Sequence, residues 1–403
     1  MADMTTTSAS RLRFNTPSDI TFGIGCIREL GELARQSGIR RALLVTDRDI
    51  ASRGMHRSAC ASLEAVGVAV TVYDDVVADP PVEVIHAATA LGATNQCDGV
   101  IGFGGGSSMD TAKLVATLLC NEQPLEAMYG VDQVRSTRKP LIQVPTTAGT
   151  GSEVTMISVV TTGANTKQGV VSRTLLADRV LLDPELTVSM PAHVTAATGI
   201  DAMVHAIESY TSARLKNPMS DLFAREALRL LAGTIAVAVR TPEDLEARSA
   251  MLLGAMYAGQ AFANAPVGAV HALAYPLGGN YHVPHGLSNS LVLPHVLRFN
   301  APAAESMYRE LLPIVVGDSA ARGSGTAHDS SVVRNTSATE QLAAHCLALA
   351  QHLGLPTRLR ELDIPQTDLP KLARESMLQQ RLLVNNPRPV TEGDALALYE
   401  QAY

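Results

Sequence analysis

The sequence has no run that approaches the roughly 20 apolar residues needed to cross a bilayer, and it has no tryptophan and only 4% aromatic residues. Its opening, MADMTTTSASRLRF, lacks the apolar centre of a secretion signal, and we interpret it as a short disordered tail. A membrane protein is therefore not expected. Hydrophobic residues make up 46% of the chain and charged residues 18%, which is typical of a soluble globular enzyme.

Paired cysteines and clustered cations are missing as well. The five cysteines show no CxxC spacing and their number is odd, which argues against a disulfide framework and against a thiolate metal site. The formal net charge of -7 and the absence of Lys and Arg clusters argue against a nucleic-acid partner. We therefore expect free thiols in a reducing cytoplasm, a small-molecule substrate, and a homodimer or larger homo-oligomer.

A chain of 403 residues is expected to form two packed domains. In the first half, β-branched runs alternate with amphipathic stretches, which indicates a doubly wound α/β domain with strands at 41–47, 68–75, 98–106 and 140–147. From about residue 194 onward an apolar period of 3.6 residues predicts an all-helical domain.

Prolines 184 and 191 mark the change of pattern, so we predict an α/β domain at 1–188 and an all-helical domain at 189–403. Residues 158–172 resemble a β-hairpin appended to the first sheet, with a Gly-Ala-Asn turn. The stretch 316–340 is rich in Ser, Gly and Thr, which predicts an exposed loop or mobile insertion.

One pair of side chains in the helical half has the spacing of metal ligands. The segment GIDAMVHAIESY places Asp201 and His205 four residues apart, so on a helix they share one face about 5–6 Å apart. A carboxylate and an imidazole suit a divalent ion such as Fe²⁺ or Zn²⁺. A surface Asp–His pair or a helix cap is the alternative for this pair taken alone.

Four more histidines follow at 271, 282, 285 and 295 in an apolar, glycine-rich stretch. We expect Pro276 and the glycine pair after it to end the helix that carries His271, while Pro284 directly precedes His285. These two histidines then lie on different elements and can converge on one point. We interpret His282 and His295 as ordinary core or surface residues. The predicted metal ligands are Asp201, His205, His271 and His285.

The segment DGVIGFGGGSSMDTAK reads as a strand, a turn of Gly104, Gly105 and Gly106, and a helix that contains Ser107 and Asp110. Glycines let a backbone approach a pyrophosphate closely, and a helix N-terminus supplies free N–H donors. The segment matches neither the GxGxxG fingerprint nor the P-loop, and a plain tight turn is the alternative.

A second polar loop, QVPTTAGTGSEVT, also follows a strand and could close on the same dinucleotide. Asp47 stands at the end of the first strand, where its carboxylate could accept from ribose hydroxyls and would repel a 2′-phosphate, which favours NAD over NADP. The second loop offers the hydroxyls of Thr146, Thr147, Thr150, Ser152 and Thr155.

Together these motifs resemble the iron-containing (group III) alcohol dehydrogenase family. The likeness runs in order from about Phe14 to Tyr403 through the blocks GGGSSMDTAK, PTTAGTGSEVT, LDPELTVSMP, ATGIDAMVHAIE, PHGLSN and LLVNNPRPVTEGDALALYEQAY. It implies an α/β domain that binds the nicotinamide cofactor, a helical domain that carries the metal, and an active site in the cleft between them.

Residue by residue, the resemblance gives the metal the same four ligands, and favours Fe²⁺ although the donor set also accepts Zn²⁺ or Mn²⁺. It places Lys167 near the nicotinamide ribose and Phe262 on the substrate pocket, where apolar Met156 and Ile157 favour a small aliphatic or aromatic alcohol. The cofactor residues that it implies are Asp47, Gly105, Gly106, Ser107, Thr146, Thr147, Thr155 and Lys167.

The sequence departs from the family at one position. Where the family commonly has a second histidine four residues after the third ligand, this chain has Tyr275. A phenol with an ordinary pKa of about 10 is a poorer acid–base group at neutral pH than imidazole. Tyr275 then either relays a proton by hydrogen bonding, reshapes the pocket, or is a structural tyrosine.

The resulting hypothesis is hydride transfer between a metal-bound alcohol and nicotinamide C4, in either direction. A hydroxyacid–oxoacid transhydrogenase and a maleylacetate reductase are the enzymatic alternatives within related proteins. A non-redox lyase resembling dehydroquinate synthase would need several cations for a phosphate-bearing acid, and the motifs hold few besides Lys113 and Lys167. A catalytically silent metal- or nucleotide-binding protein is the alternative from another class.

Overall fold

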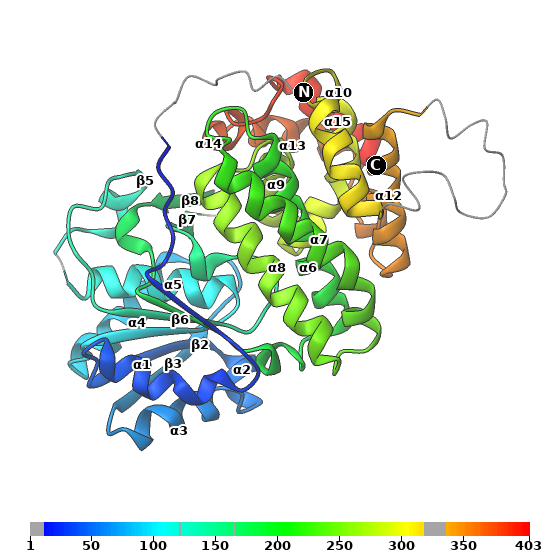
Figure 1. Ribbon diagram of the computed structural model, residues 1–403. Helices are drawn as coiled ribbons and strands as arrows, with labels where there is room; N and C mark the ends of the chain where they lie inside the picture. The colour runs from blue at the N-terminus through cyan, green and yellow to red at the C-terminus, as the bar shows by residue number, and fades with distance from the viewer. Residues whose placement is uncertain (1–11, 121, 164–165, 318–335) are drawn as a thin grey trace.

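The computed structural model describes residues 12–120, 122–163, 166–317 and 336–403. Most of the predicted tail and of the predicted loop at 316–340 lie outside the described residues. Within them the chain forms an α/β half followed by a helical half, which lie side by side in Figure 1. The fold class predicted from the sequence is confirmed.

A six-stranded sheet forms the centre of the α/β half. Its strands run in the order β1-β9-β6-β4-β2-β3, and every neighbouring pair is parallel. The four predicted strands are present, and β1 and β9 extend the sheet on the side of β6. The strands are β1 (Asp19–Phe22), β2 (Arg41–Asp47), β3 (Ala69–Val76), β4 (Gly99–Gly104), β6 (Leu141–Pro145) and β9 (Arg179–Leu182).

Helices cover both faces of this sheet, because successive strand side chains point to opposite sides. On one face Leu43 and Val100 join the apolar core beneath α4 and α5, and on the other Leu44 and Ile101 join α1 and α3. The helices of this half are α1 (Leu30–Gln36), α2 (Arg48–Ser52), α3 (Arg57–Ala65), α4 (Val82–Thr94) and α5 (Gly106–Leu118).

The predicted hairpin exists, but it does not join the large sheet. Strands β7 (Ile157–Thr162) and β8 (Thr166–Val171) pair antiparallel, and β8 pairs with the short β5 (Gly130–Val131) in a second sheet of order β5-β8-β7. The appended position was wrong because the parallel strand β9, which begins eight residues after β8, takes the place beside β6. The hairpin instead borders the functional cavity described below.

The helical half is built around α6, which packs against α7, α8 and α10. No strand occurs in this half among the described residues. None of the described helices is long and apolar enough to span a membrane. The longer helices are α6 (Ala192–Thr211), α7 (Pro218–Arg240), α8 (Leu245–Asn264), α9 (Ala269–Tyr281), α10 (His285–Val316), α12 (Ala338–His352), α13 (Leu369–Ser376), α14 (Gln380–Leu383) and α15 (Glu392–Ala402).

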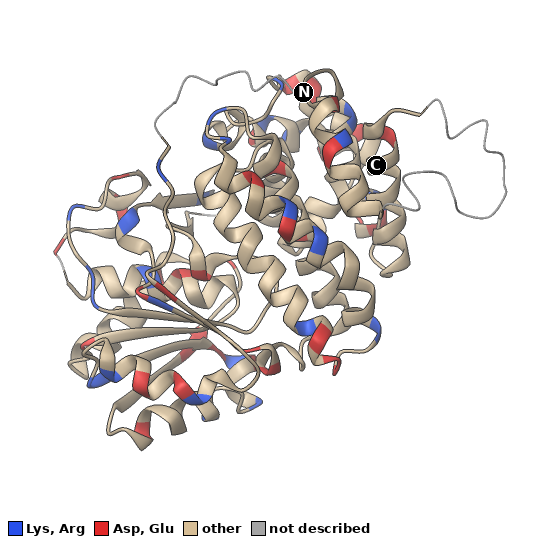
Figure 2. Ribbon diagram, in the orientation of Figure 1, with Lys and Arg blue, Asp and Glu red and all other residues tan. Residues whose placement is uncertain are grey.

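Single 3-10 turns connect these elements. The turn after β9 leads directly into α6, so the predicted boundary between residues 188 and 189 falls in this connection and stays a prediction. Lys, Arg, Asp and Glu are interspersed over both halves (Figure 2). The turns are η1 (Cys26–Glu29), η2 (Leu125–Met128), η3 (Ser152–Val154), η4 (Arg173–Leu175), η5 (Pro184–Thr187), η7 (Leu359–Leu362) and η8 (Gln366–Asp368).

The helix that carries His271 is longer than predicted. Pro276 lies inside α9, which continues through Gly278 to Tyr281. A proline removes only one helical hydrogen bond, and the buried side chains of α9, Pro276 among them, keep the helix packed. The chain turns instead at His282, whose backbone is left-handed with φ 54°.

Candidate metal centre and cofactor cleft

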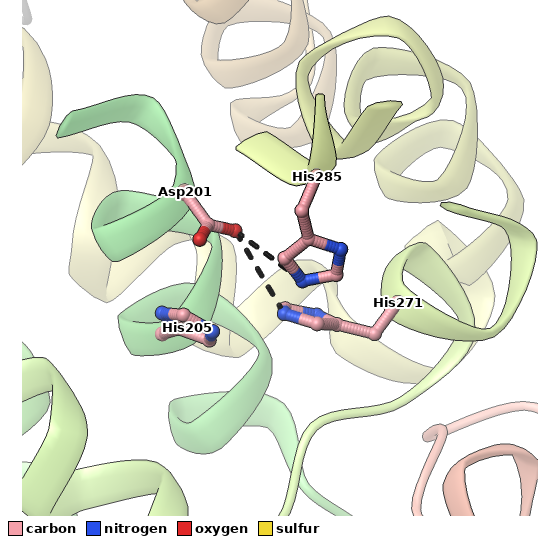
Figure 3. A group of neighbouring side chains, drawn as sticks. All are labelled: Asp201, His205, His271 and His285. Carbon is pink, nitrogen blue, oxygen red and sulfur yellow. Dashed lines mark ion pairs between the residues drawn. The ribbon is translucent and has the colours of Figure 1, made fainter. Parts of the chain in front are cut away.

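The four predicted metal ligands converge. Helix α6 carries Asp201 and His205, α9 carries His271, and His285 is the first residue of α10. One ligand atom from each lies within 4.8 Å of all the others. Figure 3 shows the carboxylate of Asp201 facing His271 and His285, and both Nε2 atoms lie 3.9 Å from its Oδ1.

The start of α10 brings His285 to the cluster, and a glycine allows the approach. Pro284 has extended backbone and precedes the helix, so His285 is placed at its very beginning. A Cβ atom on Gly286 would lie 2.3 Å from the carbonyl oxygen of Ala197 and 3.1 Å from Cβ of Asp201. Only glycine lets α10 rest this closely on the backbone of α6.

His271 is oriented by a buried carboxylate that sequence reasoning missed. Its Nδ1 donates to Oε2 of Glu208 at 2.6 Å, and the other carboxylate oxygen accepts the backbone N–H of Val270 at 2.7 Å. The bond at Nδ1 leaves Nε2 free to act as a ligand. The signal was present, because Glu208 follows Asp201 and His205 at helical spacing on the same face of α6.

Asn289, one turn after His285 on α10, was also missed. Its side-chain amide donates to Oδ1 of Asp201 at 2.6 Å and lies 3.3 Å from Nε2 of both His271 and His285. The residue is fully buried. The amide nitrogen of Asn289 thus contacts three of the candidate ligand atoms and helps to set the distances between them.

The protonation of the cluster suits cation binding. Burial lowers the pKa of His205 to about 3 and that of His285 to about 4, so both rings are neutral at pH 7 and keep a lone pair for a metal. Burial opposes ionisation of Asp201, but the neighbouring imidazoles and the Asn289 amide outweigh it, and the pKa of Asp201 is lowered. One carboxylate and three neutral imidazoles fit a divalent transition-metal ion.

The glycine turn after β4 has the predicted strand-turn-helix form. Gly104 adopts φ +150°, Gly105 is extended, and α5 begins at Gly106. The first backbone hydrogen bond at the start of α5 is donated by the N–H of Met109 to the carbonyl oxygen of Gly105. The N–H groups that precede Met109 in α5 are therefore free to bind an anion. A Cβ on Gly106 would lie 2.9 Å from the side chain of Thr150, which puts the two predicted loops in contact.

The threonine loop packs against the helical half at Gly151. This glycine has φ 60°, and a Cβ on it would lie 2.5 Å from Cα of Gly259 on α8. Thr146 is buried and its N–H donates to Gly104 at 3.0 Å. The buried hydroxyl of Thr147 has no protein hydrogen-bond partner among the described residues, and it lies beside the glycine turn.

A fully buried ammonium group ties the two loops together. Nζ of Lys113 donates to the hydroxyls of Ser152 and Thr155 at 2.8 and 3.1 Å, and to the carbonyl of Ile157 at 2.6 Å. Burial lowers the pKa of Lys113, while Asp110, 3.3 Å away, opposes this effect.

Asp110 and Asp47, both predicted to contact the cofactor, make protein hydrogen bonds. Oδ1 of Asp110 accepts from the Ser152 hydroxyl at 2.5 Å and Oδ2 from the Val159 N–H at 2.8 Å. We therefore infer that Asp110 orders the threonine loop. Asp47 caps α2 by accepting the N–H of Ile50 at 2.9 Å, while it stands at the carboxyl end of β2 as predicted.

A cavity of about 230 Å³ is lined by the four candidate metal ligands and by residues of both predicted cofactor loops. Phe262 stacks on His205 with ring centroids 4.3 Å apart, and the ring of Tyr275 lies 5.8 Å from that of His285. The predicted residues on its wall are the four ligands with Gly106, Ser107, Asp110, Thr150, Ser152, Thr155, Ile157, Lys167, Phe262 and Tyr275.

The remaining predicted residues do not line the cavity: Asp47, Gly104, Gly105, Thr146, Thr147 and Met156. His282 is exposed and His295 is half-buried away from the ligands, as expected of residues without a metal role. Two charged residues on the wall were not predicted, Asp79 and Arg381.

Comparisons with known proteins agree with this geometry. Residues 17–184 match the family described as iron-containing alcohol dehydrogenase, and residues 195–403 match the C-terminal part of the Fe-containing alcohol dehydrogenase family. The long-chain-alcohol dehydrogenase 1 of Geobacillus thermodenitrificans is 37% identical over 399 residues, which cover 98% of this chain and 97% of that protein.

Solved structures share the fold along the whole chain. A crystal structure of 1,3-propanediol oxidoreductase has a TM-score of 0.90 and 33% identity, covering 98% of this chain and 100% of the other. The sulfoacetaldehyde reductase of Bifidobacterium kashiwanohense, crystallised with NAD⁺, has a TM-score of 0.82 and 29% identity, covering 98% and 99%. With both halves matched and the ligand cluster assembled, this chain belongs to the iron-containing alcohol dehydrogenase family.

Proposed function

We propose that this chain is a metal-dependent, NAD(P)-linked alcohol dehydrogenase and aldehyde reductase that transfers a hydride between a substrate carbon and nicotinamide C4. One observation carries the proposal: a single cavity is lined by the four convergent ligands and by the two loops suited to a dinucleotide. A redox reaction of this kind needs the substrate oxygen and the nicotinamide side by side.

Asp201, His205, His271 and His285 would hold the metal, and Fe²⁺ is the ion that we propose, with Zn²⁺ and Mn²⁺ as alternatives. When bound, a divalent ion supplies a Lewis acid that stabilises negative charge on the substrate oxygen. Glu208 and Asn289 fix the ligand geometry. Phe262 stacks on His205 and lines the same cavity, where it would contact the substrate.

The cofactor would lie against the other wall. The free N–H groups at the start of α5 would bind its pyrophosphate, and the threonine loop, in contact with Gly106, would hold the cofactor from beside it. Lys167 lines the cavity from β8, where its ammonium is held by Asp79 at 2.7 Å, and we assign it to the nicotinamide ribose. Asp47 favours NAD over NADP, and a related enzyme was crystallised with NAD⁺.

Tyr275 occupies the place where a proton-relaying histidine is common in the family. Among the described residues its hydroxyl has no hydrogen-bond partner, while the residue lines the cavity near His285. We propose that this hydroxyl contacts the substrate by hydrogen bonding.

The proposal is tested with His271→Ala. Purified wild-type protein, stripped with a chelator and reloaded with Fe²⁺, Zn²⁺ or Mn²⁺, is assayed by NADH absorbance with a panel of alcohols and aldehydes. We expect the variant to lose bound metal and at least a thousandfold in kcat/KM, because a buried ligand is removed. Retained activity after loss of the metal would contradict the proposal.

The same assay separates the alternatives. Turnover with free NAD⁺ and an alcohol alone excludes a transhydrogenase that keeps its nicotinamide bound.

All five cysteines are unpaired, which agrees with our proposal of a cytoplasmic enzyme. A homodimer or larger homo-oligomer stays a prediction, and sedimentation measures it directly.

A further inference from the structure

One cation on the cavity wall has no hydrogen-bond or ion-pair partner within the part of the chain that the structure describes. Arg381, on α14, is half-buried and lines the cavity beside the buried Leu382. Among the described residues, no carboxylate or carbonyl oxygen accepts a hydrogen bond from its guanidinium. A guanidinium that is partly removed from water without an acceptor is energetically unfavourable, so this position suits a bound anion.

The guanidinium of Arg381 lies against β8. A Cβ on Gly169 would be in ordinary contact with it, 3.4 Å from Nη2. Gly169 stands two residues after Lys167, and alternate residues of a strand share a face. Both cations therefore lie on the side of β8 that faces the cavity.

The other charged groups of the cavity are already engaged. Lys167 pairs with Asp79 at 2.7 Å, and Asp110 lies 3.3 Å from Lys113. Asp201 belongs to the metal cluster. Arg381 therefore contributes a positive charge that no protein group in the described residues balances.

We propose that Arg381 binds an anionic group of the substrate, a carboxylate or a sulfonate, at the end remote from the reacting carbon. The inference rests on the proposed dehydrogenase function and narrows its substrates to alcohols and aldehydes with a terminal anion. The planar guanidinium offers two parallel N–H donors to such a group.

A phosphate of the cofactor is the other source of the same chemistry. The phosphate-binding turn, however, lies between β4 and α5, whereas α14 belongs to the helical half and packs against α9, the helix of His271 and Tyr275. Arg381 is thus placed on the substrate side, and the test below separates the two sources.

The test compares charged and neutral aldehydes of similar shape. Succinic semialdehyde is paired with pentanal, and sulfoacetaldehyde with butanal, and kcat/KM is measured with NADH for the wild type, Arg381→Met and Arg381→Lys. We expect Arg381→Met to lose about 10- to 150-fold on the charged aldehydes and less than about threefold on the neutral ones. Arg381→Lys should fall between, because it keeps the charge and loses the planar pair of donors.

Arg374→Met is the matched control, because Arg374 is exposed on α13 and does not line the cavity. Its kinetic constants should equal those of the wild type. Activity on pentanal and the thermal unfolding midpoint show that each variant is folded.

Three results would overturn the inference. If Arg381→Met changes charged and neutral aldehydes equally, no substrate anion is bound there, although the dehydrogenase function stands. If its KM for NADH or NADPH rises while the preference between aldehydes stays constant, the guanidinium binds a cofactor phosphate. If the metal-loaded wild type reduces no aldehyde and oxidises no alcohol, the dehydrogenase function fails, and this inference fails with it.

Discussion

The two sides of the cavity are built in different ways. The metal centre consists of side chains of fixed chemistry, held rigidly by buried partners such as Glu208 and Asn289. The cofactor side consists mainly of backbone: free N–H groups at the start of α5, and glycines that keep side chains out of the way. The hydroxyl groups of the threonine loop are the other part of the cofactor side.

This difference predicts how each side responds to substitution. Removal of one metal ligand, or of the glycine that brings a ligand into place, disturbs all four donors at once. On the cofactor side several N–H groups share one anion, so a single change weakens binding by a smaller factor.

The largest effect is expected from Gly286→Ala. A Cβ would meet the Ala197 carbonyl at 2.3 Å, so α10 must move away from α6 and carry His285 with it. We expect at least a hundredfold loss of metal affinity, measured by titration with a competing chelator, and about 2 kcal/mol less stability from overpacking. Unchanged metal affinity would show that the approach of α10 does not set the site.

Gly233→Ala is the control for this substitution. Gly233 lies on α7, and nothing stands within 4 Å of the position its Cβ would take. Alanine favours a helix over glycine by about 1 kcal/mol, so this variant should be slightly more stable, with wild-type metal affinity. A loss of metal affinity in both variants would mean that replacing any helical glycine lowers the affinity, wherever the glycine lies.

Glu208→Gln should have the next largest effect. The amide oxygen can still accept from Val270, but the NH₂ group would then face Nδ1 of His271 and force the ring proton onto Nε2. Because Nε2 is the atom that must bind the metal, we expect affinity to fall about 10- to 100-fold.

Chelator titration measures that affinity, and the unfolding midpoint reports the fold. Glu226→Gln, which makes the same change at a site outside the ligand cluster and the cavity, should leave the affinity as it is. Equal losses of metal affinity in Glu208→Gln and Glu226→Gln would show that the change in net charge, and not the contact with His271, causes the effect.

Gly106→Ala tests the cofactor side. Its Cβ would lie 2.9 Å from Cγ2 of Thr150, and we expect about a tenfold higher KM for NAD⁺ with unchanged metal affinity. Thr150→Ser removes that methyl group, so the double variant should recover part of the loss. No recovery would mean that the new methyl blocks the cofactor directly.

The same contrast explains what the sequence could predict. The cluster of four candidate ligands was predicted because Asp201 and His205 have helical spacing, and because a histidine that follows a proline starts a new element. Glu208 carried an equal signal and was overlooked. Arg381 carried none, since its place on the cavity wall beside β8 depends on tertiary packing.

The errors in the fold have the same origin. Pro276 lies inside α9 because buried neighbours outweigh one missing hydrogen bond, and neighbours are invisible to local rules. The short strands β1 and β9 are defined by pairing with each other and with β6, and their four residues carry little pattern of their own.

The smallest expected effect concerns a histidine whose pKa is lowered by burial although it lies outside the ligand cluster. His295 is remote from the ligands, yet burial lowers its pKa to about 4, as it does for His285. Between about pH 6.5, the ordinary histidine pKa, and pH 4 the unfolded chain binds a proton at this ring and the folded chain does not. Stability must therefore fall as the pH is lowered through this range.

At pH 5 the cost at His295 should be about 1 kcal/mol, less than full linkage implies because the ring is partly open to screening by solvent. His295→Gln carries no proton at any of these pH values, so its loss of stability from pH 7 to pH 5 should be smaller than that of the wild type. Urea unfolding of metal-free protein measures it. A variant that loses as much stability as the wild type over this range would show that the buried ring of His295 is not the cause.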